Sequence, residues 1–340
     1  MPVLDGYYFI AVLALTMVKT FKSLNLHATP EEIYLDRRSL LKTLGYAGLV
    51  ASTGPAVACR QAEAGVAAAD VLAPGIIRPE VLKRFPAPRN ADYNIKQTLT
   101  DPLVAGTHNN FYEFRPGSAG DLWRLTKDFV TDPWKIEVAG ACHKPGKFDI
   151  DDLMSIDQEE RTYRFRCVEA WAMNVPWTGF EFNKLLAKVE PLSTARFVRF
   201  TTANRPEQMP GMRQSPQYPW PYFEALRMDE AMNHLTLLAT GIYGKPLPRQ
   251  HGAPFRIIAP WKYGYKSPKS IVKIELLERQ PKTFWETLAP REYGFLSNVD
   301  PAVPHPRWSQ AQERLLGTSR TRSTLVYNGY GEHVAHMYKT

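Results

Sequence analysis

One cysteine stands out in this sequence because of the residues on either side of it. In the segment Tyr163 to Trp171, Cys167 directly follows Arg166 and stands two positions before Glu169. The thiolate is the form of cysteine that binds metals or attacks electrophiles, and neighbouring guanidinium groups favour it. Cys167 is therefore a candidate metal ligand, and Glu169 is a candidate for tuning the site or delivering protons. The alternative is an inert buried cysteine beside a structural carboxylate.

A β-strand is the element expected to position this cysteine. Tyr163, Phe165 and Cys167 alternate with Arg164 and Arg166, which is the period of a strand with one buried face. Cys167 would then lie at the end of a half-buried strand, on the same face as two aromatic rings.

A second segment combines a buried strand with a basic loop. The strand is predicted over Phe255–Ala259 and carries Arg256, and the loop after it bears Lys262, Lys266 and Lys269. Cations in a loop that contains Gly and Ser bind phosphate through their charge and through exposed backbone N–H groups. The segment matches no P-loop or dinucleotide fingerprint, so it predicts a phosphate site without specifying the ligand.

The remaining elements are expected to be short. Alternating apolar residues predict strands at Trp134–Gly140, Ala195–Thr202 and Ser270–Leu277, and helices are predicted at Asn183–Val189 and Arg307–Leu316. Between them, 204–221 is rich in proline and is predicted to be irregular. A loop of that length is usually functional or a lid.

Composition limits the possible functions. With 340 residues, 44% of them hydrophobic, the chain can build one large domain or two. Its net charge of +8 is spread along the sequence, so nucleic acid is not expected as a partner. The three cysteines form neither a disulfide framework nor a CxxC pair, and no CxxCH sequence would attach a c-type haem.

The first 69 residues are predicted to be a leader. Arg37 and Arg38 precede a weakly apolar stretch and the small residues Ala56–Ala58, a combination that resembles a twin-arginine export signal. That route moves folded proteins to the periplasm, which suggests that a cofactor is inserted before export. Residues 70–100 are expected to form an extended arm, and 101–340 the catalytic domain. A true start at Met17 and lipidation of Cys59 stay open.

Segments from residue 100 to the end resemble one family. The matching segments are Asn109–Phe114, Arg166–Trp171, Glu207–Gly211, Pro260–Gly264, Glu292–Phe295, His305–Ala311 and Asn328–Tyr330. The resemblance is to the MsrP-type catalytic subunits of periplasmic protein-methionine-sulfoxide reductases, which are molybdopterin enzymes. It implies an α+β fold, with a mixed, β-rich, sulfite oxidase-like domain, and a molybdenum–molybdopterin cofactor.

The resemblance also implies roles for individual residues. Cys167 would supply a thiolate to molybdenum, which suits a soft ligand next to a redox-active metal. The pterin and its phosphate would be held by Asn109, Tyr112, Glu113, Thr202, His251, Arg256, Ser267, Pro268 and Lys269. His251 stands where the family pattern has asparagine, and it can still donate one hydrogen bond.

The implied reaction is reduction of methionine sulfoxide in oxidised periplasmic proteins, by transfer of the oxygen atom to the metal centre. A haem-bearing membrane subunit of the MsrQ type would supply the electrons. The catalytic chain itself is expected to be a soluble monomer, because the additional dimerisation domain of larger sulfite oxidases is not found in it.

Two other functions are compatible with the sequence. A periplasmic sulfite oxidase-like enzyme would use Arg164 and Arg166 to bind sulfite, although Ala170–Met173 after the cysteine is mostly apolar. An exported binding module on the same fold would hold no metal. Molybdenum analysis of the purified protein separates that module from the enzymes.

Overall fold

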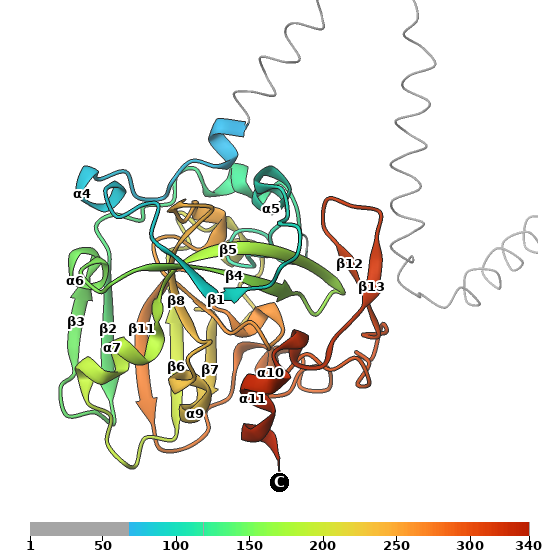
Figure 1. The fold of residues 1–340 in the computed structure, drawn as a ribbon. Helices are drawn as coiled ribbons and strands as arrows, with labels where there is room; N and C mark the ends of the chain where they lie inside the picture. The colour runs from blue at the N-terminus through green and yellow to red at the C-terminus, as the bar shows by residue number, and fades with distance from the viewer. Residues whose placement is uncertain (1–67, 118, 340) are drawn as a thin grey trace, which may run out of the picture. The chain divides into compact units, whose positions relative to one another are not determined.

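The computed structural model describes residues 68–117 and 119–339 (Figure 1). The predicted export signal, Met17 and Cys59 lie outside the described residues. Within the part of the chain that is described, no helix is long and apolar enough to cross a membrane.

Two mixed β-sheets form the body of the protein (Figure 1). The larger has the order β1-β4-β5-β12-β13, with β8 joining β5 to β9 and β10. Its strands are β1 (Arg89–Asn94), β4 (Glu159–Arg166), β5 (Trp171–Glu181), β8 (Leu237–Ile242), β9 (Lys245–Pro246), β10 (Arg256–Ile258), β12 (Gln312–Leu315) and β13 (Thr321–Ser323). β4 and β5 are antiparallel, whereas β1 runs parallel to β4 and β12 runs parallel to β5.

The smaller sheet has the order β3-β2-β11-β6-β7. Its strands are β2 (Lys135–Gly140), β3 (Gly146–Asp149), β6 (Phe197–Thr202), β7 (Phe223–Arg227) and β11 (Ile271–Leu277). β2 and β11 are parallel, and the other neighbours are antiparallel. β10 of the larger sheet and β11 of the smaller one flank the basic loop that the sequence predicts to bind phosphate.

The helices are short, and most of them connect strands. They are α4 (Pro79–Leu82), α5 (Pro102–Thr107), α6 (Ile150–Met154), α7 (Phe182–Val189), α8 (Pro210–Gln214), α9 (Met228–Met232), α10 (Phe284–Leu288) and α11 (Gly331–Val334). The 3-10 helices are η1 (Leu122–Thr126), η2 (Arg249–His251), η3 (Gly264–Lys266), η4 (Val326–Gly329) and η5 (Ala335–Tyr338). Helices this short gain their stability from packing against the sheets. The predicted α+β class with a preponderance of strands is confirmed.

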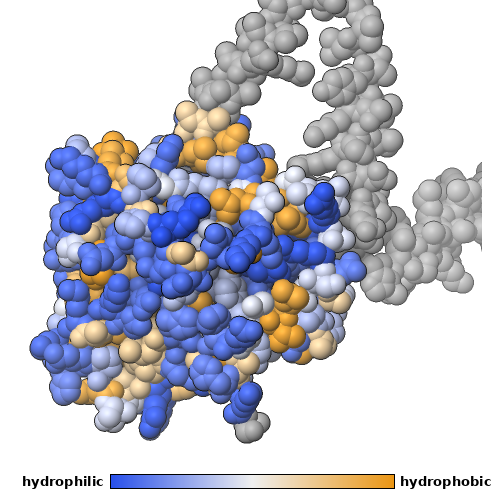
Figure 2. Space-filling model, in the orientation of Figure 1, coloured by the Kyte–Doolittle hydropathy of each residue, from blue (hydrophilic) through white to orange (hydrophobic). Residues whose placement is uncertain are grey.

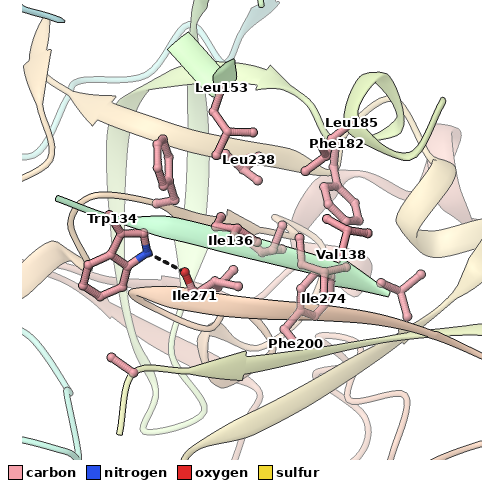
Figure 3. Close-up of a cluster of buried hydrophobic side chains, with 14 of the residues drawn as sticks. Trp134, Ile136, Val138, Leu153, Phe182, Leu185, Phe200, Leu238, Ile271 and Ile274 are labelled. Carbon is pink, nitrogen blue, oxygen red and sulfur yellow. Dashed lines mark hydrogen bonds between the residues drawn. The ribbon is translucent and has the colours of Figure 1, made fainter. Parts of the chain in front are cut away.

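The main hydrophobic core lies on the smaller sheet. Figure 3 shows Leu153 of α6 and Phe182 and Leu185 of α7 directed toward Ile136 and Val138 of β2. In α7 the buried residues follow the helical spacing i, i+3, i+4 and i+7, so one face of the helix is apolar. Each such side chain contributes about 1.5–3 kcal/mol when it is fully buried. This packing fixes the sheet that supports the basic loop.

The surface drawn in Figure 2 is mostly hydrophilic, and its apolar side chains occur in small groups. This is the distribution expected of a surface in contact with water.

The strands predicted at Trp134–Gly140, Ala195–Thr202, Phe255–Ala259 and Ser270–Leu277 are confirmed as β2, β6, β10 and β11, and the helix at Asn183–Val189 is confirmed as α7. The predicted helix Arg307–Leu316 is wrong, because 312–315 forms strand β12. β12 pairs with β5 on one side and with β13 on the other, so its backbone groups find partners in distant segments. Such non-local pairing overrides local helix preference.

Candidate active site

Cys167 lies in the tight turn that joins β4 to β5. The amide of Ala170 donates to the carbonyl of Cys167 at 3.2 Å, and the amide of Cys167 donates to Trp171 at 2.9 Å. Ala170 adopts a left-handed conformation with φ 60°. The thiol is buried and faces a pocket of ≈ 790 Å³, a volume that includes the part open to solvent.

The pocket collects most of the predicted site residues. Seven of the nine predicted cofactor-binding residues line it together with Cys167 and Glu169, namely Asn109, Tyr112, Glu113, Arg256, Ser267, Pro268 and Lys269. Thr202 and His251 are not among the lining residues. Aromatic side chains complete the wall, including Phe165, Trp171, Trp285 and Tyr293.

Asn110 connects the two predicted catalytic residues. Its Nδ2 donates to Glu169 Oε2 at 2.9 Å and lies 3.6 Å from the sulfur of Cys167. Glu169 also accepts from Trp171 Nε1 at 3.3 Å, and its own amide lies 3.5 Å from the sulfur. Asn110 was not among the predicted site residues. The available signal was its position inside the matching segment Asn109–Phe114, directly after a residue that was chosen.

Burial raises the pKa of the Cys167 thiol, and the negative charge of Glu169 raises it further. The charge of Arg166 and the hydrogen bonds from Glu169 and Asn110 act in the opposite direction. The expected effect of a neighbouring guanidinium group is confirmed for Arg166, whose charge lowers the pKa of the thiol, but burial is the larger effect and the pKa is raised overall.

The two arginines point away from the pocket and bind Glu313, whose side chain is fully buried. Arg164 Nη2 and Arg166 Nε each lie 3.0 Å from its carboxylate oxygens, and Arg322 Nε lies at 2.6 Å. Strand β4 is consequently buried on both faces, and the predicted half-buried strand is wrong in this respect. Breaking such a buried network by removing one partner costs about 3–5 kcal/mol.

The carboxy-terminal region holds the turn that carries the thiol. The carbonyl of Val168 accepts from Trp308 Nε1 at 2.8 Å and from Gln310 Nε2 at 2.7 Å. Gln310 Oε1 in turn accepts from Arg166 Nη2 at 2.7 Å, and Arg166 also donates to the carbonyl of Cys167. These contacts fix the position of the sulfur relative to the pocket.

Two cations, Arg256 and Lys269, line the same pocket as Cys167. Arg256 is buried and donates to the carbonyls of His251 at 3.0 Å and Ser267 at 3.1 Å, and Lys269 donates to Asn110 at 2.6 Å. Among the described residues no ion pair is formed by either cation, although the carboxylate of Glu113 lies near enough to raise the pKa of Lys269, and Arg256 Nε has no hydrogen-bond partner. Burial lowers the pKa of Arg256 to about 9, and burial together with Arg256 lowers that of Lys269. An anionic phosphate fits this place, because it would supply the missing charge and acceptors.

The other predicted residues form a polar lining near these cations. Glu113 is buried, accepts from Thr202 Oγ1 at 2.9 Å, and has its pKa raised to about 7 by burial. Tyr112 packs edge-to-face on Trp285 with ring centres 4.9 Å apart, and burial raises its pKa. Asn109 Nδ2 donates to two carbonyls at the end of α5, at 3.0 and 3.2 Å.

Thr202 and His251 stand one residue behind the pocket. Thr202 reaches it through Glu113, and His251 through its carbonyl contact with Arg256. His251 is buried, and its Nδ1 has no partner among the described residues. Asn110 Oδ1 is also buried without one. These unpaired polar atoms, together with the two cations, fit a polar and anionic cofactor such as molybdopterin.

Comparison with known proteins agrees with this geometry. Residues 124–285 match the family model of the oxidoreductase molybdopterin binding domain. The chain is 46% identical over 319 residues to the protein-methionine-sulfoxide reductase catalytic subunit MsrP of Burkholderia mallei, covering 92% of this chain and 91% of the relative. It is 45% identical to the MsrP of Xanthomonas campestris pv. campestris, covering 91% of this chain and 93% of the relative. The chain belongs to the MsrP family.

Membership of the MsrP family confirms the predicted enzyme class, a molybdopterin-dependent protein-methionine-sulfoxide reductase. Among solved structures, the sulfane dehydrogenase SoxCD of Paracoccus pantotrophus aligns with a TM-score of 0.42 and 16% identity, covering 50% of this chain and 49% of that one. The fold class rests on the two sheets and on the family match.

Proposed function

We propose that Cys167 is the residue that binds molybdenum in this MsrP family member, and that the pocket in front of it reduces methionine sulfoxide in periplasmic proteins. The observation that carries the proposal is a buried thiol in the same pocket as two cations without a carboxylate partner among the described residues. When bound, the molybdenum–molybdopterin group supplies a redox-active metal that accepts the oxygen atom of a sulfoxide and leaves a thioether.

Several residues of the chain would share the binding of this group. Arg256 and Lys269 would bind the phosphate, with Ser267 and Pro268 lining the wall beside them. Asn109, Tyr112 and Glu113 would hold the pterin, with Thr202 bonded to Glu113 and the carbonyl of His251 bonded to Arg256. Cys167, which lines the same pocket, would provide the soft sulfur ligand.

Glu169 is the group we assign to proton delivery. Two electrons and two protons are needed to release the oxygen of each sulfoxide as water, and a carboxylate near the reacting atom can carry these protons. Asn110 and Trp171 hold Glu169 Oε2 on the pocket side of the turn. The aromatic wall, including Trp285 and Tyr293, leaves an apolar surface for the thioether product.

Sulfite oxidation gains no support from the site. Arg164 and Arg166 do not line the pocket and are engaged by Glu313. These two arginines are therefore not placed to bind sulfite in the pocket.

We also propose that the chain reaches the periplasm by the twin-arginine route and receives electrons from a haem-bearing membrane subunit of the MsrQ type. The motif at Arg37 and Arg38 supports the route. The relatives are named catalytic subunits, and this name supports the proposal that the chain acts together with another subunit. The proposed division is a leader over 1–69, an arm over 70–100 and a catalytic domain over 101–340.

The test compares Cys167→Ser with Cys142→Ser, a substitution at the other free cysteine in the described residues. Each protein is expressed with cofactor biosynthesis, and both molybdenum content and turnover of methionine sulfoxide with a reduced dye are measured. Activity should disappear in Cys167→Ser and persist in Cys142→Ser. Full activity in Cys167→Ser would refute the assignment of the ligand, and a native protein without molybdenum would refute the proposed function.

A further inference from the structure

A second hollow lies beside the catalytic pocket. Its empty space is ≈ 960 Å³, including the part open to solvent, and Val168, Tyr265 and Tyr293 line both hollows. Most of its other lining comes from residues 292–305. We call it the lateral groove. Val168 belongs to the turn that carries Cys167, so the lateral groove and the catalytic pocket share the wall that this turn forms.

The lateral groove carries exposed apolar side chains at its edge. Val303 is 62% exposed, Val326 49% and Leu296 39%, and all three line the groove. A single exposed apolar residue is ordinary, but several around one hollow beside an active site mark a binding surface. The carboxylate of Glu292, which also lines the groove, is paired with Arg307 at 2.8 Å.

Buried contacts hold the lateral groove in shape. Lys262 Nζ donates to the carbonyl of Leu296 at 2.7 Å and to Asn298 Oδ1 at 2.9 Å, while it pairs with Glu230 at 2.6 Å. The amide of Tyr263 donates to the carbonyl of Ser297 at 3.0 Å. A surface that is already ordered loses less entropy when a partner binds.

We propose that the lateral groove binds the polypeptide segment next to the oxidised methionine, through apolar side chains of that segment. This inference rests on the proposed function. Methionine residues are usually buried among apolar neighbours, and oxidation to the polar sulfoxide disrupts that packing. The segment that carries a sulfoxide into the catalytic pocket is therefore rich in apolar side chains, which match Leu296, Val303 and Val326. A sulfoxide without flanking residues leaves the groove unused.

The experiment uses the molybdenum-loaded full chain and three substrates. They are N-acetylmethionine sulfoxide amide, a short peptide with a central methionine sulfoxide between Leu and Val residues, and the same peptide with Ser in their place. The variants are Val303→Asp and Val130→Asp, since Val130 is also an exposed valine, at 46%, and lines neither hollow.

For the native protein we expect the highest kcat/KM with the apolar-flanked peptide. Val303→Asp should lower kcat/KM for that peptide about tenfold, equivalent to about 1.4 kcal/mol, and should change the small sulfoxide and the Ser peptide less than about twofold. Val130→Asp should match the native protein on all three substrates. The Kd of a labelled apolar peptide with unoxidised methionine, measured by fluorescence anisotropy, should rise about tenfold in Val303→Asp alone.

The inference would be overturned if Val303→Asp had the same ratio of kcat/KM for the apolar peptide to kcat/KM for the small sulfoxide as the native protein. This holds whether the two kcat/KM values fall together or both stay unchanged. That result leaves the proposed function standing. If the native chain turns over none of the three substrates, the proposed function fails and the inference fails with it.

Discussion

Replacing Lys269 with Gln should weaken binding of the cofactor without lowering the free energy of unfolding of the cofactor-free protein. Lys269 lies in the catalytic pocket, donates to the carbonyl of Asn110, and forms no ion pair in the described residues. The amide of Gln can still donate a hydrogen bond, so the substitution removes mainly the positive charge. Arg256 stays in place and leaves the site with one cation.

The size of the effect follows from the contacts that are lost. A hydrogen bond between charged groups contributes about 1.5–3 kcal/mol, so cofactor binding should weaken about 10- to 150-fold. In the cofactor-free protein the charge of Lys269 is unfavourable, because burial and Arg256 both lower its pKa. The free energy of unfolding of that form should therefore stay constant or rise by about 1 kcal/mol, which corresponds to about 2 °C or more in Tm.

The assay measures molybdenum per protein after extended dialysis, and Tm of protein made without cofactor biosynthesis. Lys273→Gln serves as the control, because Lys273 is partly exposed, pairs with Glu275 at 2.8 Å, and does not line the pocket. The reasoning is refuted if Lys269→Gln keeps all its molybdenum and the cofactor-free form is destabilised by more than about 1 kcal/mol. Lys269 would then be a structural residue that holds Asn110.

Three further predictions concern residues around the pocket. Glu313→Gln should lower the free energy of unfolding by about 3–5 kcal/mol in urea titrations, because three guanidinium groups lose their carboxylate. As a control, substitution of an exposed carboxylate, Glu332→Gln, should change it by less than about 0.5 kcal/mol. A loss below about 1 kcal/mol in Glu313→Gln would contradict the buried network. Asn110→Ala should lower kcat about tenfold or more with molybdenum retained, since the donor to the carboxylate near the thiol is lost, and an unchanged kcat would remove Asn110 from the site. Burial and the charge of Arg314 lower the pKa of His108 to about 4, below its unfolded value. The contribution of neutral His108 to the free energy of unfolding is therefore complete above pH ~6.5. It is lost as the pH falls toward ~4, by up to about 3 kcal/mol. His108→Phe should flatten that part of the curve of unfolding free energy against pH, and an identical slope in both proteins would contradict the assignment.

The sequence was informative where the pattern is local. The alternation around Cys167 predicts the strand that ends at the thiol, and the helical spacing of buried residues in α7 is visible in the sequence itself. The ion pairs of Arg164 and Arg166 were not predicted, because their partner Glu313 lies about 150 positions away along the chain. Alternation does place Arg164 and Arg166 on the face of the strand opposite the sulfur, but it cannot show which carboxylate pairs with them.

The same limit explains the error at 312–315. Gln312–Leu315 consists of residues that favour helices, but its pairing with β5 and β13 makes it a strand. At the pocket, family resemblance found Arg256 and Lys269, whereas the link through Asn110 requires side-chain distances.

The contacts of the carboxy-terminal region with the thiol turn constrain the order in which this protein matures. Trp308 and Gln310 bind the carbonyl of Val168, Glu313 neutralises the arginines of β4, and Tyr330 accepts from the amide of Arg164. These partners follow the residues that they bind by 140 to 166 positions along the chain. The turn that presents Cys167 therefore cannot take its final form until residues 308–330 have been synthesised, and a complete cofactor site forms only after that.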